Sequence, residues 1–378
     1  MISKQFQWHP NASLFFEGVQ LNQNDLKHHG LNVLDSIFTP DIARGPYFQT
    51  QSGGTTGQPK ALKRTHSSWL RSFDIHQSLF KIGPHSRYGV LGRLDHSLAL
   101  YATVEAINLG SDVHLMGHLR PNEQAAALQE IPCSVIYATP TQVMRLVDYD
   151  GLKQTDVILI GGGRLSPEQR TALTNAAPNA DIRVFYGAAE TSFITLSDHE
   201  TPLDSVGRAY PDVKIDIRSI DETSGIGEIW VQSPYLFENY SDGSSEETRW
   251  NGDWLSVGEL GRMDDDGYLF LHGRKNRMFT IADQNIYPEA IERVLSNHPT
   301  ITHSAVIPMP DEKRGSRAIA FHDGHELSAS DLRKWCRISL SDRAVPSEFV
   351  YIPTDDWPFL SSGKTDLRAL TTRLDSRS

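Results

Sequence analysis

A short segment near the start of the chain is dense in glycine and hydroxyl residues and ends in a lysine. It runs from Gln51 to Lys60 and reads Gln-Ser-Gly-Gly-Thr-Thr-Gly-Gln-Pro-Lys. Glycines let backbone amides converge on anionic oxygens, while threonine hydroxyls and a lysine ammonium add donors and positive charge. The segment therefore predicts a polyphosphate-binding loop, with contacts from Ser52, Gly53, Gly54, Thr55, Thr56, Gly57 and Lys60.

This loop differs from the P-loop of kinases and GTPases. In a P-loop the lysine directly follows the last glycine and a Ser or Thr comes next, whereas here Gln58 and Pro59 precede Lys60. A flexible surface linker is the alternative interpretation, because runs of Gly, Ser and Thr often form linkers. The Pro-Lys ending favours a phosphate loop over a linker.

Further blocks of sequence extend the pattern, and together they resemble the adenylate-forming (ANL) superfamily of acyl-CoA synthetases, adenylation domains and luciferases. The phosphate loop of that family reads Ser/Thr-Ser-Gly-Thr-Thr-Gly-x-Pro-Lys, which residues 52–60 match with Gly53 in place of a Ser. The block Tyr186-Gly187-Ala188-Ala189-Glu190 resembles its Tyr-Gly-x-Thr-Glu. The other matching blocks, in the family's order, lie at 227–231, 254–259, 266–274, 285–292 and 361–366.

The resemblance implies ATP-dependent activation of a carboxylic acid, closest to the acyl-CoA synthetases and aryl-acid adenylating enzymes. The carboxylate would attack the α-phosphorus of ATP and expel pyrophosphate, and a thiol of CoA or phosphopantetheine would then capture the acyl-adenylate and release AMP. Because two anions must meet while charge builds on the phosphate, catalysis would consist mostly of positioning and cationic stabilisation.

The resemblance also implies roles for single residues. Lys364 would bridge the carboxylate and α-phosphate oxygens, and Glu190 would hold Mg²⁺ through a hard oxygen ligand. Tyr186 would stack on adenine, while Glu259 and Arg274 would hold the ribose hydroxyls. The nucleotide site would be completed by backbone at Gly162, Gly163 and Gly187. Taken alone, a lysine or glutamate of this kind is usually solvated and a glycine run is usually a turn.

Three positions depart from the family pattern. Ala189 stands where the family has Thr, and Glu259 stands where it usually has Asp. Each change is expected to weaken ATP binding modestly, since a lost hydrogen bond is worth about 0.5–1.5 kcal/mol. Asp283 falls where relatives commonly have a Gly that lines the thiol tunnel, so its carboxylate is expected to hinder the thioester step more than adenylation.

The segment Leu94-Asp95-His96-Ser97-Leu98 occupies the position of the family's acid pocket. His96 fits the histidine with which fatty and aryl acid ligases contact the acid. An amino-acid adenylation domain is the alternative, with Asp95 pairing with the α-ammonium of the substrate. Asp95 as a helix cap is a third interpretation. We favour a plain acid, because the loop followed by Arg64-Thr65-His66 is closest to aryl and acyl ligases.

A protein without turnover remains an alternative of a different class. The departures described above also suit a relative that only binds adenylate or a carrier protein. Against this, Lys60, Glu190, Arg274 and Lys364 all keep the chemical types that the reaction requires. The sequence therefore predicts an enzyme, an acid-thiol ligase.

The elements that must position these residues alternate between strand-like and helix-like segments, which predicts an α/β fold. Buried strands are expected at 135–138, 157–160 and 182–186, the last delivering Glu190 past its carboxyl end. A helix is expected from Pro167 to Ala177, begun by Ser166. Alternation at 213–217 and a turn at 265–267 predict hairpins beyond Val206.

The resemblance implies two domains, a large N-terminal one over 1–274 and a small mobile α+β one over 275–378 that carries Lys364 and rotates about Asn276. In typical relatives the phosphate loop begins well beyond residue one hundred, but here it begins near residue 52. The first subdomain is therefore expected to be largely missing. Surface exposed by that loss would favour a homodimer or a partner protein.

Composition agrees with this interpretation. The net charge of −11 over 378 residues argues against nucleic acid as a partner. The expected partners are a small carboxylic acid and, as one alternative for the thiol, an acyl carrier protein. We expect no membrane span, no signal peptide and a cytoplasmic location. The two cysteines indicate no disulfide framework.

Overall fold

The computed structural model describes residues 5–39, 45–51, 60–222, 224–360 and 365–375, which fall into two compact units. Unit 1 comprises Met1–Asp216, Trp230–Val257 and Asp264–Leu269, and unit 2 comprises Ile217–Ile229, Gly258–Met263 and Phe270–Ser378. The predicted domain boundary after Arg274 and the hinge at Asn276 remain predictions.

Unit 1 is built on a nine-stranded sheet among the described residues, in the order β11-β10-β9-β8-β7-β5-β6-β1-β2. The strands from β9 to β1 run parallel, and β10, β11 and β2 run antiparallel to their neighbours. Their bounds are β1 Ser13–Phe16, β2 Val19–Leu21, β5 Arg87–Val90, β6 Asp112–Leu115, β7 Val135–Ala138, β8 Val157–Ile160, β9 Asp181–Ala188, β10 Ser192–Leu196 and β11 Arg208–Ala209.

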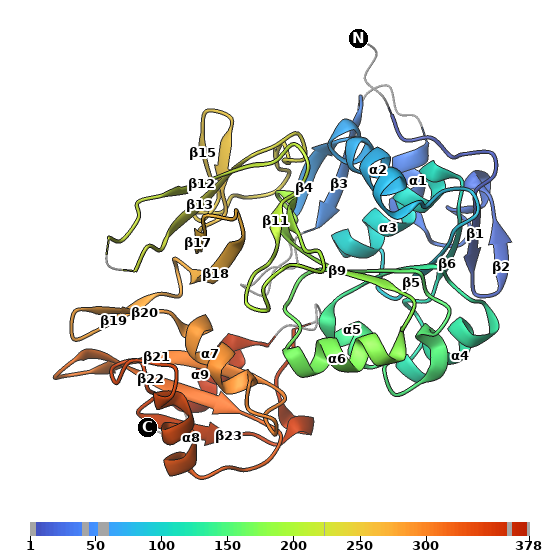
Figure 1. Cartoon of the computed structure of the whole chain (residues 1–378). Coiled ribbons are helices and arrows are strands. Elements are labelled where there is room, and N and C mark those ends of the chain that lie inside the picture. Colours follow the sequence, from blue (N-terminus) through green and yellow to red (C-terminus); the bar gives the residue numbers. More distant parts are fainter. Residues whose placement is uncertain (1–4, 40–44, 52–59, 223, 361–364, 376–378) are drawn as a thin grey trace. The chain divides into compact units, whose positions relative to one another are not determined.

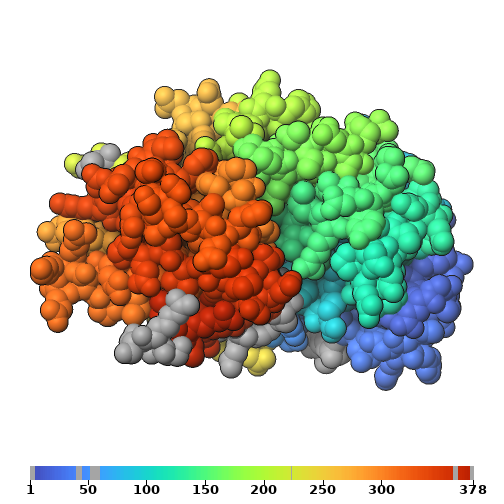
Figure 2. Space-filling view, turned by 90° about the horizontal axis from the view of Figure 1, so that it is seen from below, coloured from blue at the N-terminus to red at the C-terminus, as the bar shows by residue number. Residues whose placement is uncertain are grey.

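Helices cover both faces of this sheet, so its central strands β7 and β8 are apolar throughout. In Figure 1, α1, α2 and α3 lie on one side of the sheet and α4, α5 and α6 on the other. Figure 2 shows the second side from outside, where the teal and green side chains of α4 to α6 form the surface. The helices are α1 Asn32–Phe38, α2 Ser67–Phe80, α3 Ser97–Leu109, α4 Pro121–Glu130, α5 Pro140–Met144 and α6 Pro167–Ala176.

The local sequence signals for these elements are confirmed. The predicted strands at 135–138 and 157–160 are β7 and β8, and all their residues are buried. The predicted helix is α6, where the Ser166 side chain accepts a hydrogen bond from the Gln169 amide and Pro167 occupies the first turn. A capping box and an N-terminal proline each satisfy or remove amides that a helix start leaves without partners.

A polar cluster lies inside the layer between the sheet and the helices α2 and α3. His76 and Glu105 are fully buried, and their side chains are joined by a 2.7 Å contact between Nδ1 and Oε1. The hydroxyls of Tyr88, Tyr101 and Tyr137 all donate to the same carboxylate. Burial raises the pKa of each of these tyrosines, and the glutamate raises it further, so the phenols stay protonated and act as donors.

The predicted phosphate loop connects two paired strands of unit 1. Strand β3 (Tyr47–Gln51) pairs antiparallel with β4 (Ala61–Thr65), and Gln51 lies opposite Ala61. Strand β14 (Asn239–Tyr240) pairs with the other edge of β4. Before β3, the described residues form the β1–β2 hairpin, a 3-10 turn at Gln23–Asp25 and α1, which is consistent with a shortened first subdomain.

The remaining strands of unit 1 form hairpins, as predicted beyond Val206. Strand β15 (Arg249–Asn251) pairs with β16 (Trp254–Ser256), and β16 pairs with the end of β13 at Val231. A turn at Asp264–Tyr268 places Gly267 at φ +80°, where glycine is favoured. The predicted alternation at 213–217 corresponds to β12 (Lys214–Arg218).

Unit 2 has the expected α+β character. A three-stranded sheet in the order β21-β22-β23 is covered by α7 and α8 on one face and by α9 on the other. Successive residues alternate between these faces, so Val306 packs with α7 while Ile307 packs with α9. The bounds in unit 2 are β17 Glu259–Met263, β18 Leu269–Arg274, β19 Phe279–Ile281, β20 Gln284–Ile286, α7 Pro288–Ser296, β21 Ser304–Asp311, β22 Gly315–His322, α8 Ala329–Arg337, β23 Glu348–Tyr351 and α9 Leu367–Asp375, and β13 (Gly227–Gln232) begins here.

None of the helices within the described ranges combines the length and the apolar character that crossing a bilayer requires.

The polar cluster yields a stability prediction. Replacing Glu105 with Ala leaves buried hydroxyls and His76 without their common acceptor, so the free energy of unfolding should fall by about 3 kcal/mol or more. Urea unfolding followed by tryptophan fluorescence measures this change. Glu130→Ala, at an exposed position of α4, is the control and should change stability by about 0.5 kcal/mol or less. A loss for Glu105→Ala no larger than that of the control would contradict the role given to the cluster.

Candidate nucleotide and acid site

Lys60, the last residue of the predicted phosphate loop, is held beside a tyrosine. Its Nζ donates to the backbone oxygen of Ser244 at 2.9 Å and lies 5.5 Å from the ring centroid of Tyr240. The ammonium therefore has a defined position at the start of β4. Residues Ser52, Gly53, Gly54, Thr55, Thr56 and Gly57 lie outside the described residues, so their role as phosphate ligands stays a prediction.

The same tyrosine contacts the predicted magnesium ligand. The Tyr240 hydroxyl donates to Oε1 of Glu190 at 2.7 Å and lies 2.8 Å from Oγ1 of Thr248. Burial raises the pKa of Tyr240, and the adjacent Glu190 carboxylate raises it further, so the phenol remains a donor. Tyr240 thus brings Lys60 and Glu190 together in unit 1, which sequence reasoning did not anticipate.

Glu190 lies in the tight connection between β9 and β10. The Thr191 amide donates to the Ala188 oxygen at 3.2 Å, and the Phe237 amide donates to the Glu190 backbone oxygen at 2.8 Å. Ser192, which begins β10, has φ +55°, a conformation that L-residues rarely adopt. The backbone around Glu190 is therefore fixed from both sides, as a metal-binding carboxylate requires.

The backbone at Gly187 and Gly162, two of the predicted nucleotide-site glycines, and at the neighbouring Gly161 favours glycine over any other residue. A side chain at Gly187 would collide with the backbone oxygen of Ser192 on the paired strand. A side chain at Gly161 would collide with the ring of Phe185, and Gly162 has φ +78°. Tyr186 is 8% exposed, and Gly163 lies against Pro140. Contacts of these residues with adenine remain a prediction.

The predicted acid segment leads into the first turn of α3 and lies next to the end of β3. The Ser97 hydroxyl donates to the backbone oxygen of Gln51 at 2.8 Å, so the acid segment and the phosphate loop start from neighbouring points. His96 is the residue before the helix, and its side chain is 37% exposed.

The capping interpretation of Asp95 is wrong. The N-cap of α3 is His96, and no side-chain hydrogen bond caps this helix. The Asp95 carboxylate instead contacts Nε of Arg93 at 3.3 Å and Nε2 of His96 at 3.9 Å. The helix begins one residue later than the capping interpretation requires, so Asp95 is left for the charge contacts.

In unit 2 the two residues predicted to hold the ribose contact each other. An Nη of Arg274 lies 3.0 Å from Oε1 of Glu259, and both side chains are mostly shielded from solvent. Next to this pair, Lys275 lies 3.4 Å from the buried carboxylate of Glu228. The longer Glu, where the family usually has Asp, thus reaches the arginine. Ribose binding by the pair remains a prediction.

Asp283 lies at the tip of the β19–β20 hairpin. Ala282 and Asp283 occupy the two central positions of its turn, with φ +47° and +67°. A two-residue turn of this kind requires positive φ at both positions, which explains why glycine suits the site and why Asp is tolerated better than most residues. Its effect on a thiol remains a prediction, and Lys364 lies outside the described residues.

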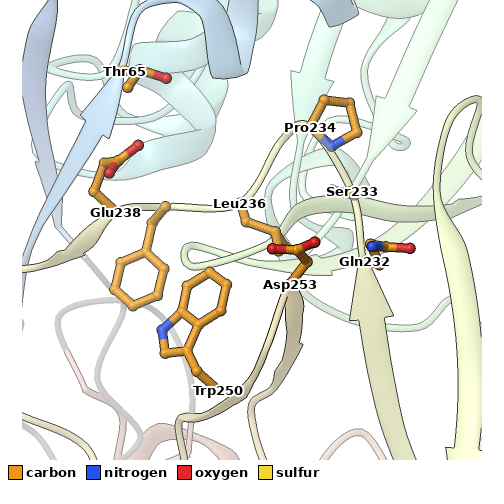
Figure 3. A pocket seen from close by; sticks show the side chains of 9 residues that line it. Thr65, Gln232, Ser233, Pro234, Leu236, Glu238, Trp250 and Asp253 are labelled. Atoms are coloured by element: carbon orange, nitrogen blue, oxygen red, sulfur yellow. The ribbon is translucent and has the colours of Figure 1, made fainter.

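A hollow of about 440 Å³ lies elsewhere in unit 1 and contains none of the predicted site residues. Its lining includes Thr65, Leu236, Glu238, Trp250 and Asp253. In Figure 3, Glu238 and Trp250 border one side of it, while Gln232, Ser233 and Pro234 border the other. The hollow is next to β14, and one of its lining residues, Phe237, is the residue whose amide donates to the Glu190 backbone oxygen.

The donor set around Glu190 suits magnesium bound together with a nucleotide. Among the residues that the structure describes, no group of three His, Cys, Asp or Glu side chains forms a metal site of its own. Mg²⁺ is usually held by one or two carboxylates together with substrate phosphates and water. A single positioned carboxylate beside a phosphate loop fits that pattern.

Comparison with known families decides what kind of protein carries this arrangement. Residues 39–241 match the model of the family described as AMP-binding enzyme, and residues 290–364 match its C-terminal domain. The chain belongs to the AMP-binding enzyme family. The resemblance inferred from the motif blocks and the expectation of an enzyme are thereby confirmed.

Curated relatives of this AMP-binding enzyme carry ligase names. The uncharacterized acyl-CoA ligase YhfT of Bacillus subtilis is 34% identical over 84% of this chain and 67% of its own length. The putative long chain fatty acid-CoA ligase VraA of Staphylococcus epidermidis is 29% identical over 89% of this chain and 74% of its own length.

Solved structures confirm the α/β fold. The o-succinylbenzoate coenzyme A synthetase MenE of Bacillus subtilis, in complex with ATP and magnesium ion, superposes with a TM-score of 0.75 at 24% identity. The match covers 86% of this AMP-binding enzyme and 69% of the MenE chain.

The ribose pair yields a binding prediction. Glu259→Gln keeps the shape of the side chain but removes its charge, so both its contact with Arg274 and its expected hydrogen bond to a ribose hydroxyl weaken. AMP affinity measured by calorimetry should fall by roughly tenfold, as for a lost charge-assisted hydrogen bond. Glu312→Gln, an exposed position of unit 2, is the control. Equal AMP affinity in the two variants would remove Glu259 from the nucleotide site.

Proposed function

We propose that this AMP-binding enzyme activates a carboxylic acid with ATP and transfers the acyl group to a thiol. The observation that carries the proposal is the joint placement of Lys60 and Glu190 by Tyr240, beside the hairpin that bears the phosphate loop. The ligase names of YhfT and VraA and the ATP complex of MenE support the same reaction.

In the first step the carboxylate of the acid attacks the α-phosphorus of ATP. The bond from this phosphorus to the bridging oxygen breaks, and pyrophosphate leaves with its electron pair. In the second step a thiolate attacks the acyl carbonyl, AMP leaves, and the thiol proton is released to solvent. CoA is the thiol that the relatives' names support, and phosphopantetheine on a carrier protein is the alternative acceptor.

The residues of this chain supply charge and position rather than a covalent intermediate. The ammonium groups of Lys60 and Lys364 would offset the negative charge of the phosphates and of the incoming carboxylate. Glu190 would bind Mg²⁺, which when present neutralises phosphate charge. Arg274 and Glu259 would hold the ribose, and His96 would contact the acid.

A substitution at Lys364 tests the first step. Lys364→Ala removes the cation that would join the two anions, so acid-dependent exchange of labelled pyrophosphate into ATP should fall by roughly a hundredfold or more. Lys313→Ala replaces an exposed lysine of unit 2 and should leave exchange unchanged. Full exchange in Lys364→Ala would refute the assignment. Absence of exchange in the unaltered chain over a broad acid panel, with ATP still bound, would instead indicate a protein that only binds adenylate.

The acid class needs a second test. Asp95 already contacts Arg93 and His96, and a plain acid has no ammonium for it to bind. Asp95→Ala should therefore change exchange by no more than about twofold with fatty and aryl acids, as expected for a surface ion pair. A panel of acids, assayed with and without CoA, measures both the acid and the thiol step. Activity only with amino acids, abolished in Asp95→Ala, would establish amino-acid adenylation instead.

A further inference from the structure

Arg64 is an arginine on the buried face of β4, four residues after Lys60. Its residue is 0% exposed, whereas most arginines of folded proteins reach solvent. Along β4 the buried positions are Leu62 and Arg64, so the guanidinium takes a place that alternation would give to an apolar side chain.

The guanidinium contacts the connection that carries Glu190. Nη1 donates to the backbone oxygen of Ala189 at 2.5 Å, and Nη2 donates to Oγ of Ser192 at 2.5 Å. Nη2 also donates to the backbone oxygen of Tyr235. One side chain therefore joins β4 to both ends of the Glu190 turn and to the segment that leads into β14.

The Ser192 hydroxyl in the Ala188–Ser192 turn accepts hydrogen bonds from both Arg64 and Trp69. Ser192 is the residue at φ +55°, and its hydroxyl also accepts from Nε1 of Trp69 at 3.2 Å. Both donors are buried, and the Arg64 guanidinium lies 5.8 Å from the Trp69 ring centroid. A strained residue persists only when its surroundings hold it in place, and here Arg64 and Trp69 provide the contacts.

The charge of Arg64 acts on Glu190 as well. The guanidinium donates to two backbone oxygens and a hydroxyl, all of them neutral. The Glu190 carboxylate is near enough for a Coulombic attraction, which opposes the lowering of the Arg64 pKa to about 9 by burial. At neutral pH the guanidinium is therefore a desolvated cation beside the predicted metal ligand, where attraction is screened little by water.

We propose that Arg64 is a positioning residue for the magnesium-binding carboxylate: its hydrogen bonds fix the Ala188–Ser192 turn, and with it Glu190, against the strand that follows the phosphate loop. This inference rests on the proposed function, because it takes Glu190 as the magnesium ligand. Arg64 itself touches neither substrate nor metal. It couples the two sides of the site, the loop strand β4 and the glutamate turn.

The test is the magnesium dependence of ATP binding and of pyrophosphate exchange in Arg64→Met and Arg64→Lys. In Arg64→Met, which loses the charge and the hydrogen bonds, the magnesium concentration for half-maximal exchange should rise by roughly tenfold. KM for the acid should change by no more than about twofold, since the acid segment makes none of these contacts. Arg64→Lys keeps the charge but not the fork of donors, so it should give an intermediate value.

Arg71→Gln is the matched control, because Arg71 is an exposed arginine of the same unit that pairs with Asp212 at 2.8 Å. It should leave the magnesium midpoint unchanged. A purely structural role for Arg64 would lower the melting temperature and the folded fraction without moving that midpoint, and this result would overturn the inference. If circular dichroism shows that Arg64→Met is unfolded, the magnesium midpoint of Arg64→Lys is compared with that of the unaltered chain instead. An unchanged midpoint in Arg64→Lys would then overturn the inference.

The two proposals fail in different ways. If the unaltered chain binds ATP with magnesium but shows no exchange with any acid, the proposed function fails, and calorimetric magnesium midpoints for ATP binding still test Arg64. If exchange occurs and its magnesium midpoint is equal in all variants, the inference about Arg64 fails while the proposed function stands.

Discussion

The buried guanidinium of Arg64 connects three segments of unit 1 through its hydrogen bonds. Moving a cation out of water is unfavourable unless acceptors meet it, and removing such acceptors is strongly destabilising. The oxygens of Ala189, Ser192 and Tyr235 must therefore lie where Arg64 can reach them. This requirement links strand β4, the turn before β10 and the segment before β14, which are distant in sequence. Lys60 directly precedes β4, Glu190 lies in the turn and Tyr240 lies in β14.

The sheet behind these segments supplies the rigidity. Parallel strands covered on both faces present their carboxyl ends at one edge, where ligands of α/β proteins usually bind. On one face the contact with α2 and α3 includes a polar cluster in which three tyrosine hydroxyls and Nδ1 of His76 meet the Glu105 carboxylate. Directional hydrogen bonds of this kind specify one packing arrangement more narrowly than apolar contacts alone. The helix that begins after His96 is thereby held against the strands that precede the site.

Much of this architecture could be predicted from local sequence. The apolar runs of β7 and β8 and the Ser166–Pro167 start of α6 carry strong signals, because burial on two faces and helix capping depend on nearby residues. The role of Glu190 was predicted from the block around it. Its neighbours Tyr240 and Arg64 were not, because their role depends on contacts across 50 and 125 or more residues. An arginine at an inward position of a short strand was the available signal for Arg64.

Other features needed coordinates for similar reasons. Helix α3 begins at Ser97, one residue later than a cap at Asp95 would require. Helix boundaries are the least predictable part of an element. The pairing of Arg274 with Glu259 required the strands β17 and β18 to be neighbours. The identity of the acid depends on the shape of its pocket. The pattern of charge and hydrophobicity along the chain does not reveal that shape.

The central claim is that the hairpin loop after β3 and the carboxylate of Glu190 form one nucleotide site. A crystal structure of the chain with ATP and magnesium tests it most directly. The account predicts triphosphate density at residues 52–57 and a metal ion about 2.0–2.1 Å from a carboxylate oxygen of Glu190. An empty loop with nucleotide bound elsewhere, such as in the hollow beside Trp250, would contradict it.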